Sequence, residues 1–438
     1  MRVRGAYRQH SPSRWLGRRG LAVLAAAALV VVACGEEIDP DDDADPDADP
    51  AEEVDDDPDP DVDDDDEPTA EGGEINIGAL LAMTGGGSWY GEVMSAGAEQ
   101  AVNEINEEGG VAGYEFNLIT EDHESGDADA AVSSVRKLLD VDDANVVLSS
   151  FTAPTVAVQP ITSEAGVLLL NGGGVGDELI GQEALYNTRM LGAQLMPPLV
   201  EWALDEYDAQ TFAVIHWNDD AGRALNDTVV RECEELGCEV VESEPHEIDE
   251  RNFSPMLARI AAAEPDVLVV GSWGNDVGHI LDQARRQGIE VPAIGNEWTP
   301  DAQEIGGEAM EDYVAVLDTF DADNPVHAEA EQFIEGYTES FGETPEFYGA
   351  NYYELIRFVV AELVEMVVDD GGDPTEPGAL VDAMEEAVAA DHEFGSIYGD
   401  QMTFQGDGTI LKPAGVYRVE DGSLNRFAAL EEDQVVPE

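Results

Sequence analysis

Basic residues are scarce in this sequence. Lysine occurs twice, as Lys137 and Lys412, and lysine and arginine together number 19 against 97 acidic residues, giving a net charge of −78. A surface this negative repels phosphate groups, which excludes nucleic acid and anionic lipid as binding partners. Because salt screens such self-repulsion, the composition favours adaptation to a saline exterior over a merely acidic secreted protein.

The sequence also lacks the motifs of common catalytic and cofactor sites. It has no phosphate-binding loop ending in Gly-Lys-Ser/Thr, no Gly-x-Ser-x-Gly nucleophile turn and no His-Glu-x-x-His metal pair. The acidic run Glu121–Glu124 surrounds His123, but in so acidic a chain it is better explained as a solvated edge than as a metal site. We therefore expect a protein that is not an enzyme and that holds no metal or cofactor.

The amino terminus has the pattern of an export signal. Six arginines precede residues 20–33, which are uncharged, and 14 residues are too few for a helix that spans a membrane. Residues 1–33 are therefore predicted to be a signal peptide, and the twin arginines Arg18 and Arg19 leave the export route open. The sequence Val31-Val32-Ala33-Cys34-Gly35 resembles a bacterial lipobox, in which the cysteine is lipidated and anchors the mature chain to the membrane.

Residues 34–72 follow as an acidic segment. From position 36 to 72 there are 22 acidic residues and no basic one, together with proline and alanine. Such a sequence cannot bury apolar surface, so we expect a disordered tether, and it lacks the glycine and ligand spacing of a calcium loop. The remaining residues, 73–438, contain 75 acidic and 13 basic residues, a net charge of −62.

From residue 74 onward, short apolar strands alternate with amphipathic helices, which predicts an α/β fold with parallel sheets. The expected strands are 75–82, 115–120, 145–148, 167–170, 211–216, 239–242, 266–271 and 292–295. The expected helices are 92–107, 128–140, 155–164, 221–236, 254–263 and 276–287, with three more between 323 and 390 and strands within 402–419. The pattern restarts after Pro197 and Pro198, which indicates two lobes in succession.

The loops that follow the strands are the expected ligand site, because ligands of open α/β sheets bind beyond the carboxyl ends of the strands. They are rich in glycine and hydroxyl groups at positions 83–91, 149–155 and 171–176. Glycine lets the backbone approach a ligand closely, and the amino terminus of a helix presents free N–H groups to an anion.

Three segments of the body carry a resemblance to a known family. Residues 97–113 (GAEQAVNEINEEGGVAG), 252–260 (NFSPMLARI) and 280–288 (ILDQARRQG) resemble, in order and spacing, the leucine/isoleucine/valine-binding protein family, the type I periplasmic solute-binding proteins of ABC importers. The resemblance implies two lobes joined by three crossings, with 73–193 plus 322–402 in lobe I and 194–321 plus 403–438 in lobe II. It also implies a monomer that captures a small solute, an amino acid above all, and delivers it to an ABC permease.

The resemblance also implies a set of ligand contacts. Thr152 and the backbone at Gly173 would meet a carboxylate, and Glu297 would meet an α-ammonium. Val175 and Ala221 depart from the family pattern, which has a threonine and a tyrosine there, so an amide, a urea-like solute or a small carboxylate is the alternative ligand. The implied ligand-binding residues are Tyr90, Phe151, Thr152, Gly173, Val175, Trp273, Glu297 and Tyr352.

Two questions stay open at the level of sequence. Cys233 and Cys238 lie on either side of Gly237, and they form either a short-loop disulfide or two buried thiols. The alternative to transport is a ligand-sensing receptor component. Since no second apolar span or output domain is expected after the last strand, a lipid-anchored binding protein on the outer face of the cytoplasmic membrane is the favoured interpretation.

Overall fold

The computed structural model describes residues 72–248, 250–322, 325–399, 401–431 and 434–437. The signal peptide, Cys34 and the acidic tether up to residue 71 lie outside the described residues, so those expectations stay predictions. Among the helices that the model describes, none is long and apolar enough to cross a membrane.

The first half of the body forms a five-stranded parallel sheet in the order β2-β1-β3-β4-β5. Its central strands are short and fully buried, as expected for a parallel sheet covered on both faces. The strands are β1 (Gly73–Leu81), β2 (Tyr114–Asp122), β3 (Val146–Ser149), β4 (Leu168–Asn171) and β5 (Leu185–Asn187).

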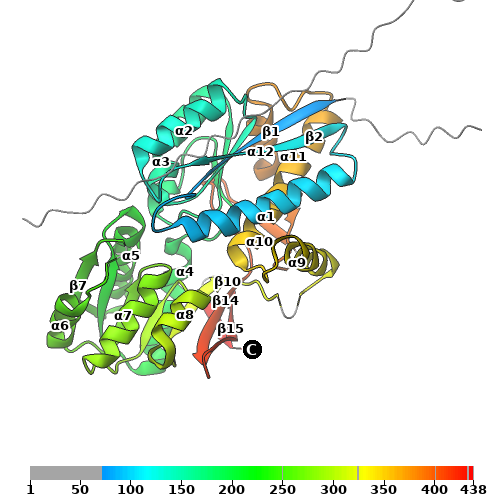
Figure 1. Ribbon diagram of the computed structural model, residues 1–438. Coiled ribbons are helices and arrows are strands. Elements are labelled where there is room, and N and C mark those ends of the chain that lie inside the picture. Colours follow the sequence, from blue (N-terminus) through cyan, green and yellow to red (C-terminus); the bar gives the residue numbers. More distant parts are fainter. Residues whose placement is uncertain (1–71, 249, 323–324, 400, 432–433, 438) are drawn as a thin grey trace, which may run out of the picture. The chain divides into compact units, whose positions relative to one another are not determined.

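Helices cover both faces of this first sheet. In Figure 1, α2 and α3 lie side by side, and α1 lies near α9 and α10. The covering helices are α1 (Ser88–Glu107), α2 (Ala128–Asp140), α3 (Thr152–Ala165), α9 (Ala328–Phe341), α10 (Phe347–Glu354), α11 (Ala361–Asp369) and α12 (Ala379–Ala389), with a short 3₁₀ helix, η1 (Asp177–Leu179), after β4. A π-helical segment (Leu355–Val360) joins α10 to α11 without a break, so the predicted three helices of this region are present.

The second sheet has eight strands in the order β16-β15-β14-β10-β9-β8-β6-β7. The strands β6 to β10 are parallel, and β14 joins β10 in antiparallel register. The strands are β6 (Thr211–Trp217), β7 (Glu239–His246), β8 (Val267–Gly271), β9 (Ala293–Gly295), β10 (Val314–Asp318), β14 (Ala414–Glu420), β15 (Ser423–Glu431) and β16 (Gln434–Pro437).

Five helices accompany the second sheet, and α7 and α8 run side by side in Figure 1. They are α4 (Gly192–Tyr207), α5 (Asp220–Leu236), α6 (Ser254–Ala263), α7 (Asn275–Arg286) and α8 (Pro300–Gly306), with a 3₁₀ turn at Gly307–Met310. Pro197 and Pro198 lie inside α4, where we expected a break between lobes; the helix begins earlier, at Gly192, and continues through both.

The chain passes between the two sheets three times, as expected. It leaves the first sheet after β5, leaves the second after β10, and returns to it at β14. Before the last passage, β11 (Glu393–Gly395), β12 (Gln401–Phe404) and β13 (Ile410–Leu411) form a small antiparallel sheet. The predicted lobe boundary at 402/403 falls inside β12, and the division of the chain into lobes by residue number stays a prediction.

Cys233 and Cys238 form a disulfide, with Cα atoms 4.5 Å apart. Gly237, between them, ends α5 with a left-handed φ of 85°, a conformation that a glycine adopts without steric cost. This tight turn brings the end of α5 back to the start of β7, which decides the question that the sequence left open.

Candidate functional site

A small cavity lies where the carboxyl ends of strands from both sheets converge. Its volume is about 30 Å³, about twice the minimum that one water requires. Residues that follow β1, β3 and β4 line one side, residues that follow β6 and β8 line the other, and α10 contributes one tyrosine. The lining residues are Tyr90, Met94, Phe151, Thr152, Gly173, Gly174, Val175, Trp217, Asp219, Ala221, Trp273 and Tyr348.

Five aromatic side chains form most of the wall. Tyr90 contacts Phe151 and Tyr348 edge-on, with ring centroids 6.0 and 4.9 Å apart. On the second lobe, the rings of Trp217 and Trp273 lie 5.2 Å apart and tilted by 52°. These rings make a low-dielectric cavity in which any charge interacts strongly.

Thr152 is placed to bind an anionic oxygen. Its Oγ1 accepts hydrogen bonds from the backbone N–H groups of Val175 (3.3 Å) and Gly176 (3.1 Å), so its own hydroxyl proton is available to a ligand. Phe151, the residue before it, has a φ of 62°, a strained backbone conformation for a non-glycine residue. Such strain is found at ligand-binding sites, where it fixes the direction of a loop.

Two buried histidines form hydrogen bonds with the serines that precede Phe151 and Trp273. His123 Nδ1 accepts from the N–H of Gly126 (3.0 Å), so its Nε2–H donates to Ser150 Oγ (2.9 Å), next to Phe151. His246 takes the other tautomer: its Nδ1 donates to the carbonyl of Glu247, and its Nε2 accepts from Ser272, next to Trp273. Burial lowers the pKa of both imidazoles to about 4, so they stay neutral at pH 7.

The sequence predicts that His123 and its acidic neighbours form a solvated edge and not a metal site. Asp122 uses its carboxylate to bind the backbone of Met83 and Thr84 and the Thr84 hydroxyl. No group of three potential metal ligands occurs among the residues that the structure describes.

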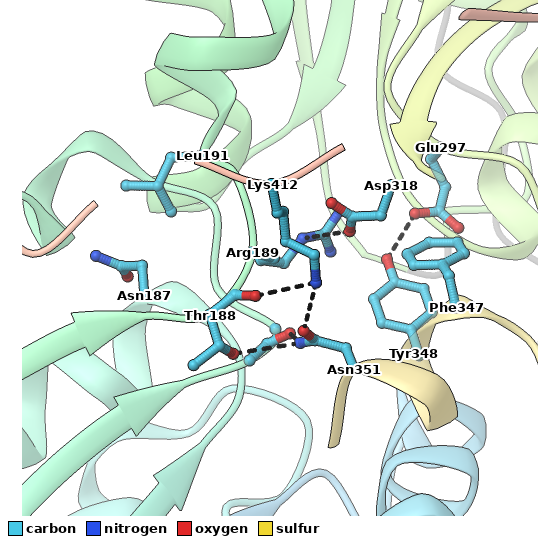
Figure 2. Close-up of polar contacts among 12 residues, drawn as sticks. Asn187, Thr188, Arg189, Leu191, Glu297, Asp318, Phe347, Tyr348, Asn351 and Lys412 are labelled. Carbon is cyan, nitrogen blue, oxygen red and sulfur yellow. Dashed lines mark hydrogen bonds and ion pairs between the residues drawn. The ribbon is translucent and has the colours of Figure 1, made fainter. Parts of the chain in front are cut away.

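Glu297 lies behind the aromatic wall and is fully buried. Its Oε2 accepts a hydrogen bond of 2.7 Å from the Tyr348 hydroxyl, while its Oε1 has no hydrogen-bond partner within the described chain (Figure 2). Burial raises the pKa of this carboxyl to about 8, although the Tyr348 hydrogen bond, the Arg189 charge and the Tyr90 hydroxyl oppose the rise. The hydroxyl of Tyr90 is likewise buried without a partner.

Arg189 provides the nearest buried positive charge to Glu297. It follows β5 on the first crossing, and its guanidinium lies 3.5 Å from Asp318, at the end of β10 on the second crossing. The guanidinium also lies over the rings of Tyr348 (5.2 Å) and Phe347 (5.6 Å). The ion pair therefore ties two crossings together directly beside the site (Figure 2).

The third crossing carries Lys412, whose side chain is completely buried. Its Nζ lies 2.5 Å from Glu354 on α10 and donates to the Thr188 carbonyl (3.2 Å) and the Asn351 amide oxygen (3.1 Å). It also lies 3.7 Å from the ring centroid of Tyr398. Each of the three crossings thus holds a buried charge, and Figure 2 shows the hydrogen bonds of Lys412 to Thr188 and Asn351.

The structure brings together most of the residues that the sequence singled out. Six line the cavity, and Glu297 lies one hydrogen bond behind it, through Tyr348. Tyr352 does not line it, because its hydroxyl donates to the carbonyl of Ser149. The six are Tyr90, Phe151, Thr152, Gly173, Val175 and Trp273; their roles in ligand binding stay predictions.

Sequence reasoning missed four residues of this region. Trp217 is the last residue of β6 and Asp219 follows that strand, just as Trp273 follows β8, so the same rule of strand ends could have found them. Tyr348 lies one helical turn before Tyr352 on α10. Arg189 gave no signal, because a lone arginine in sequence is usually solvent-exposed.

Comparisons with known proteins agree with this architecture. A family profile described as "Periplasmic binding protein" matches residues 74–423. A protein of Pseudomonas aeruginosa named "Amino acid binding protein" is 25% identical over 292 residues, which are 66% of this chain and 78% of that protein. The "Leu/Ile/Val-binding protein" of Escherichia coli K12 is 26% identical over 242 residues, which are 54% of this chain and 66% of that protein.

Solved structures with the same fold include proteins that bind different solutes. A leucine binding protein of Thermotoga maritima has a TM-score of 0.71 at 20% identity, covering 81% of this chain and 98% of that one. A branched-chain amino acid binding protein of Streptococcus pneumoniae, in complex with isoleucine, has a TM-score of 0.69 at 22% identity, covering 83% and 100%. A solute binding protein of R. palustris, in complex with benzoate, has a TM-score of 0.69 at 16% identity, covering 83% and 98%. These likenesses confirm the expected two-lobed α/β fold.

Proposed function

Because the chain belongs to the periplasmic binding protein family, we propose that it captures an α-amino acid between its two lobes and delivers it to an ABC permease. The relatives named for amino-acid or Leu/Ile/Val binding support this assignment. Members of the family bind solutes outside the cytoplasm, so the proposed setting is extracytoplasmic. A lipid anchor on Cys34, a monomeric state and the absence of enzymatic activity are parts of the same proposal.

The observation that carries the proposal is the pairing of a hydroxyl group in the cavity wall with a buried carboxyl that lies one hydrogen bond behind that wall. On the first lobe, Thr152 can donate its hydroxyl proton to a carboxylate, with the backbone of Gly173 and Gly174 beside it. On the second lobe, the buried Glu297 has one carboxylate oxygen without a partner. An α-amino acid carries the two complementary charges on adjacent groups, so it would bind both lobes at once and favour their closure.

A carboxylate ligand without an ammonium is the alternative, as in the R. palustris neighbour that binds benzoate. The aromatic wall could pack against such a ligand. Val175 has no hydroxyl group that would favour an amino acid over a simple carboxylate, or the reverse. Glu297 does distinguish them, because a buried carboxylate repels an anion but stabilises an ammonium. Its replacement therefore tests the proposal.

The test is calorimetry of the folded body with leucine, isoleucine, valine and benzoate, on the wild type and on Glu297→Gln. We expect amino-acid affinity to fall at least about tenfold, because the ammonium loses its counter-charge. Glu304→Gln, an exposed carboxylate on α8, is the matched control and should bind as the wild type does. Unchanged amino-acid affinity in Glu297→Gln, or binding of benzoate alone, would contradict the proposal.

A further inference from the structure

The second-lobe end of the cavity differs in character from the end near Thr152. It consists of Trp217, Asp219, Ala221 and Trp273, which lie at or just after the carboxyl ends of the neighbouring strands β6 and β8. Ala221 has a small side chain, so the two indoles and the carboxylate dominate this end. We refer to these four residues as the tryptophan corner.

The indole rings of this corner are held firmly. Trp217 Nε1 donates a hydrogen bond of 2.9 Å to Asp276, which is itself buried, and both tryptophans are only 6% exposed. The face of an indole carries negative electrostatic potential, and it is the best aromatic partner for a cation. Two rings fixed at an angle beside a carboxylate form a partial cage for a positively charged group.

The side chains that line the cavity provide no positive charge. The lining contains the Asp219 carboxylate and no lysine, arginine or histidine. Arg223, on the same helix, bonds to Asp220 and Asn218, and Arg189 pairs with Asp318 behind Tyr348. The wall therefore holds one acidic side chain, Asp219, and no positive one, and the carboxyl of Glu297 lies one hydrogen bond behind it, with Arg189 as a nearby charge.

Asp219 is also the N-cap residue of α5, but helix capping does not explain why an acidic residue lines the cavity. One of its oxygens caps the helix by accepting from the N–H of Gly222 (2.8 Å). A serine, threonine or asparagine could also cap the helix without placing a charge in the lining of the cavity. A second sign of a polar ligand is the Tyr90 hydroxyl, which is buried, forms no hydrogen bond within the described chain and lies close enough to Glu297 to affect the pKa of that carboxyl.

We propose that the ligand is an amino acid whose side chain carries a positive charge, and that, once the lobes part to admit it, this charge lies between Trp217, Trp273 and the Asp219 carboxylate. The inference rests on the proposed capture of an α-amino acid, whose ammonium meets Glu297 and whose carboxylate meets Thr152. A ligand with two positive groups and one negative group matches two acidic groups and one anion-binding loop. The ligand class is thus basic or alkylated-ammonium amino acids, rather than branched-chain ones.

The test compares ligands that differ by one charge. L-Norleucine is L-lysine without the side-chain ammonium, and Nε-trimethyl-lysine keeps the charge while removing its hydrogen-bond donors. By calorimetry on the wild-type protein, we expect lysine and trimethyl-lysine to bind at least about tenfold more tightly than norleucine. The difference is the attraction of one partly buried positive charge to the carboxylate and the indole rings.

The variant Asp219→Asn keeps the helix cap and removes the charge. It should weaken lysine binding at least about tenfold and leave norleucine binding within about twofold of the wild type. Asp220→Asn is the matched control: Asp220 is adjacent, bonds to Arg223 and is not part of the lining, so its effect should stay within about twofold for both ligands. Trp217→Leu gives a second variant, in which trimethyl-lysine should lose more affinity than norleucine.

The outcomes separate this proposal from the proposed function. If norleucine or leucine binds as tightly as lysine, or if Asp219→Asn weakens both alike, the cationic side chain is refuted and the amino-acid function stands. If the wild type binds no α-amino acid, both proposals fail together. If Asp219→Asn does not fold by circular dichroism, the Trp217→Leu ratio of trimethyl-lysine to norleucine decides the matter.

Discussion

Binding of an ammonium next to Glu297 should release a proton from the protein. Burial raises the pKa of Glu297 to about 8 in the free protein, against an ordinary value of 4.5. At pH 7 the carboxyl is therefore about nine-tenths protonated. An ammonium placed beside it favours the charged form, so the pKa falls on binding and the proton leaves.

The structure sets the size and sign of this effect. If the bound pKa falls well below 7, about 0.9 proton is released per ligand at pH 7. Affinity should then rise with pH, by close to tenfold per unit below about pH 8, and become flat above it. The same carboxyl affects the stability of the free protein: because its folded pKa lies above its unfolded one, the folded state binds more protons between about pH 4.5 and 8. Its contribution therefore becomes less favourable as pH rises through that window, by about 3 kcal/mol between acid pH and pH 7.

The assay is calorimetry at pH 7 in buffers of low and high ionisation enthalpy, because the dependence of the observed heat on the buffer gives the number of protons released. Glu297→Gln should release far fewer protons than the wild type, and what remains should come from the other partly buried carboxyls near the cavity, Glu346 and Asp219, whose pKa burial also raises. The pKa of the two buried histidines is lowered to about 4, so neither titrates near pH 7. Wild-type binding without proton release, or the same release in Glu297→Gln, would refute the assignment of Glu297 as the ammonium partner.

Three further predictions concern stability. Because residues 73–438 carry a net charge of −62, the urea midpoint should be clearly higher at about 2 M salt than at about 0.1 M, and equal midpoints would contradict salt adaptation. The Cys233–Cys238 bridge closes a loop with a sequence separation of 5, so the double variant Cys233→Ser/Cys238→Ser should lose about 2 kcal/mol of unfolding free energy. The chemically reduced wild type is the control and should lose the same amount; a loss in the double variant alone would show that the serine side chains, and not the missing bridge, cause it. Lys412→Met leaves Glu354 buried without its cation and should cost about 3–5 kcal/mol in urea unfolding, part of which Lys412→Met/Glu354→Gln should recover; no recovery would show that the pair itself does not account for the loss.

The alternation of strands and helices, and with it the fold, could be predicted because each element carries its own pattern. β3 and β4 are continuous apolar runs, and α2 and α6 begin and end at the predicted residues. The rule that ligands bind beyond strand ends named the loops 83–91, 149–155 and 171–176. The family resemblance singled out Tyr90, Phe151, Thr152, Gly173, Val175 and Trp273, and all six line one cavity. These signals are local, so a single sequence contains them.

The predictions that failed concern residues whose positions depend on the packing of segments that are distant in sequence. Tyr348 and Tyr352 lie one turn apart on the same face of α10, and only the folded chain shows that Tyr348 reaches Glu297 while Tyr352 bonds to the Ser149 carbonyl. Pro197 and Pro198 look like a boundary but lie inside α4. The buried charges of Arg189 and Lys412 depend on Asp318 and Glu354, which are more than 50 residues away in sequence and become neighbours only in the folded chain.

The two lysines differ so much in environment that they offer a selective handle for amine chemistry. Lys137 is about half exposed and pairs with Glu121 and Asp142, whereas Lys412 is completely enclosed by the crossings. The hydrogen bonds that Lys137 donates to Glu121 and Asp142 raise its pKa, so an acylating reagent needs mildly alkaline pH to react there. Apart from the chain's amino terminus, a dye would then attach at one place, on the far end of α2 from the cavity loops. Labelling of Lys412 would begin only when the crossings come apart, so its appearance by mass spectrometry would time the opening of this region.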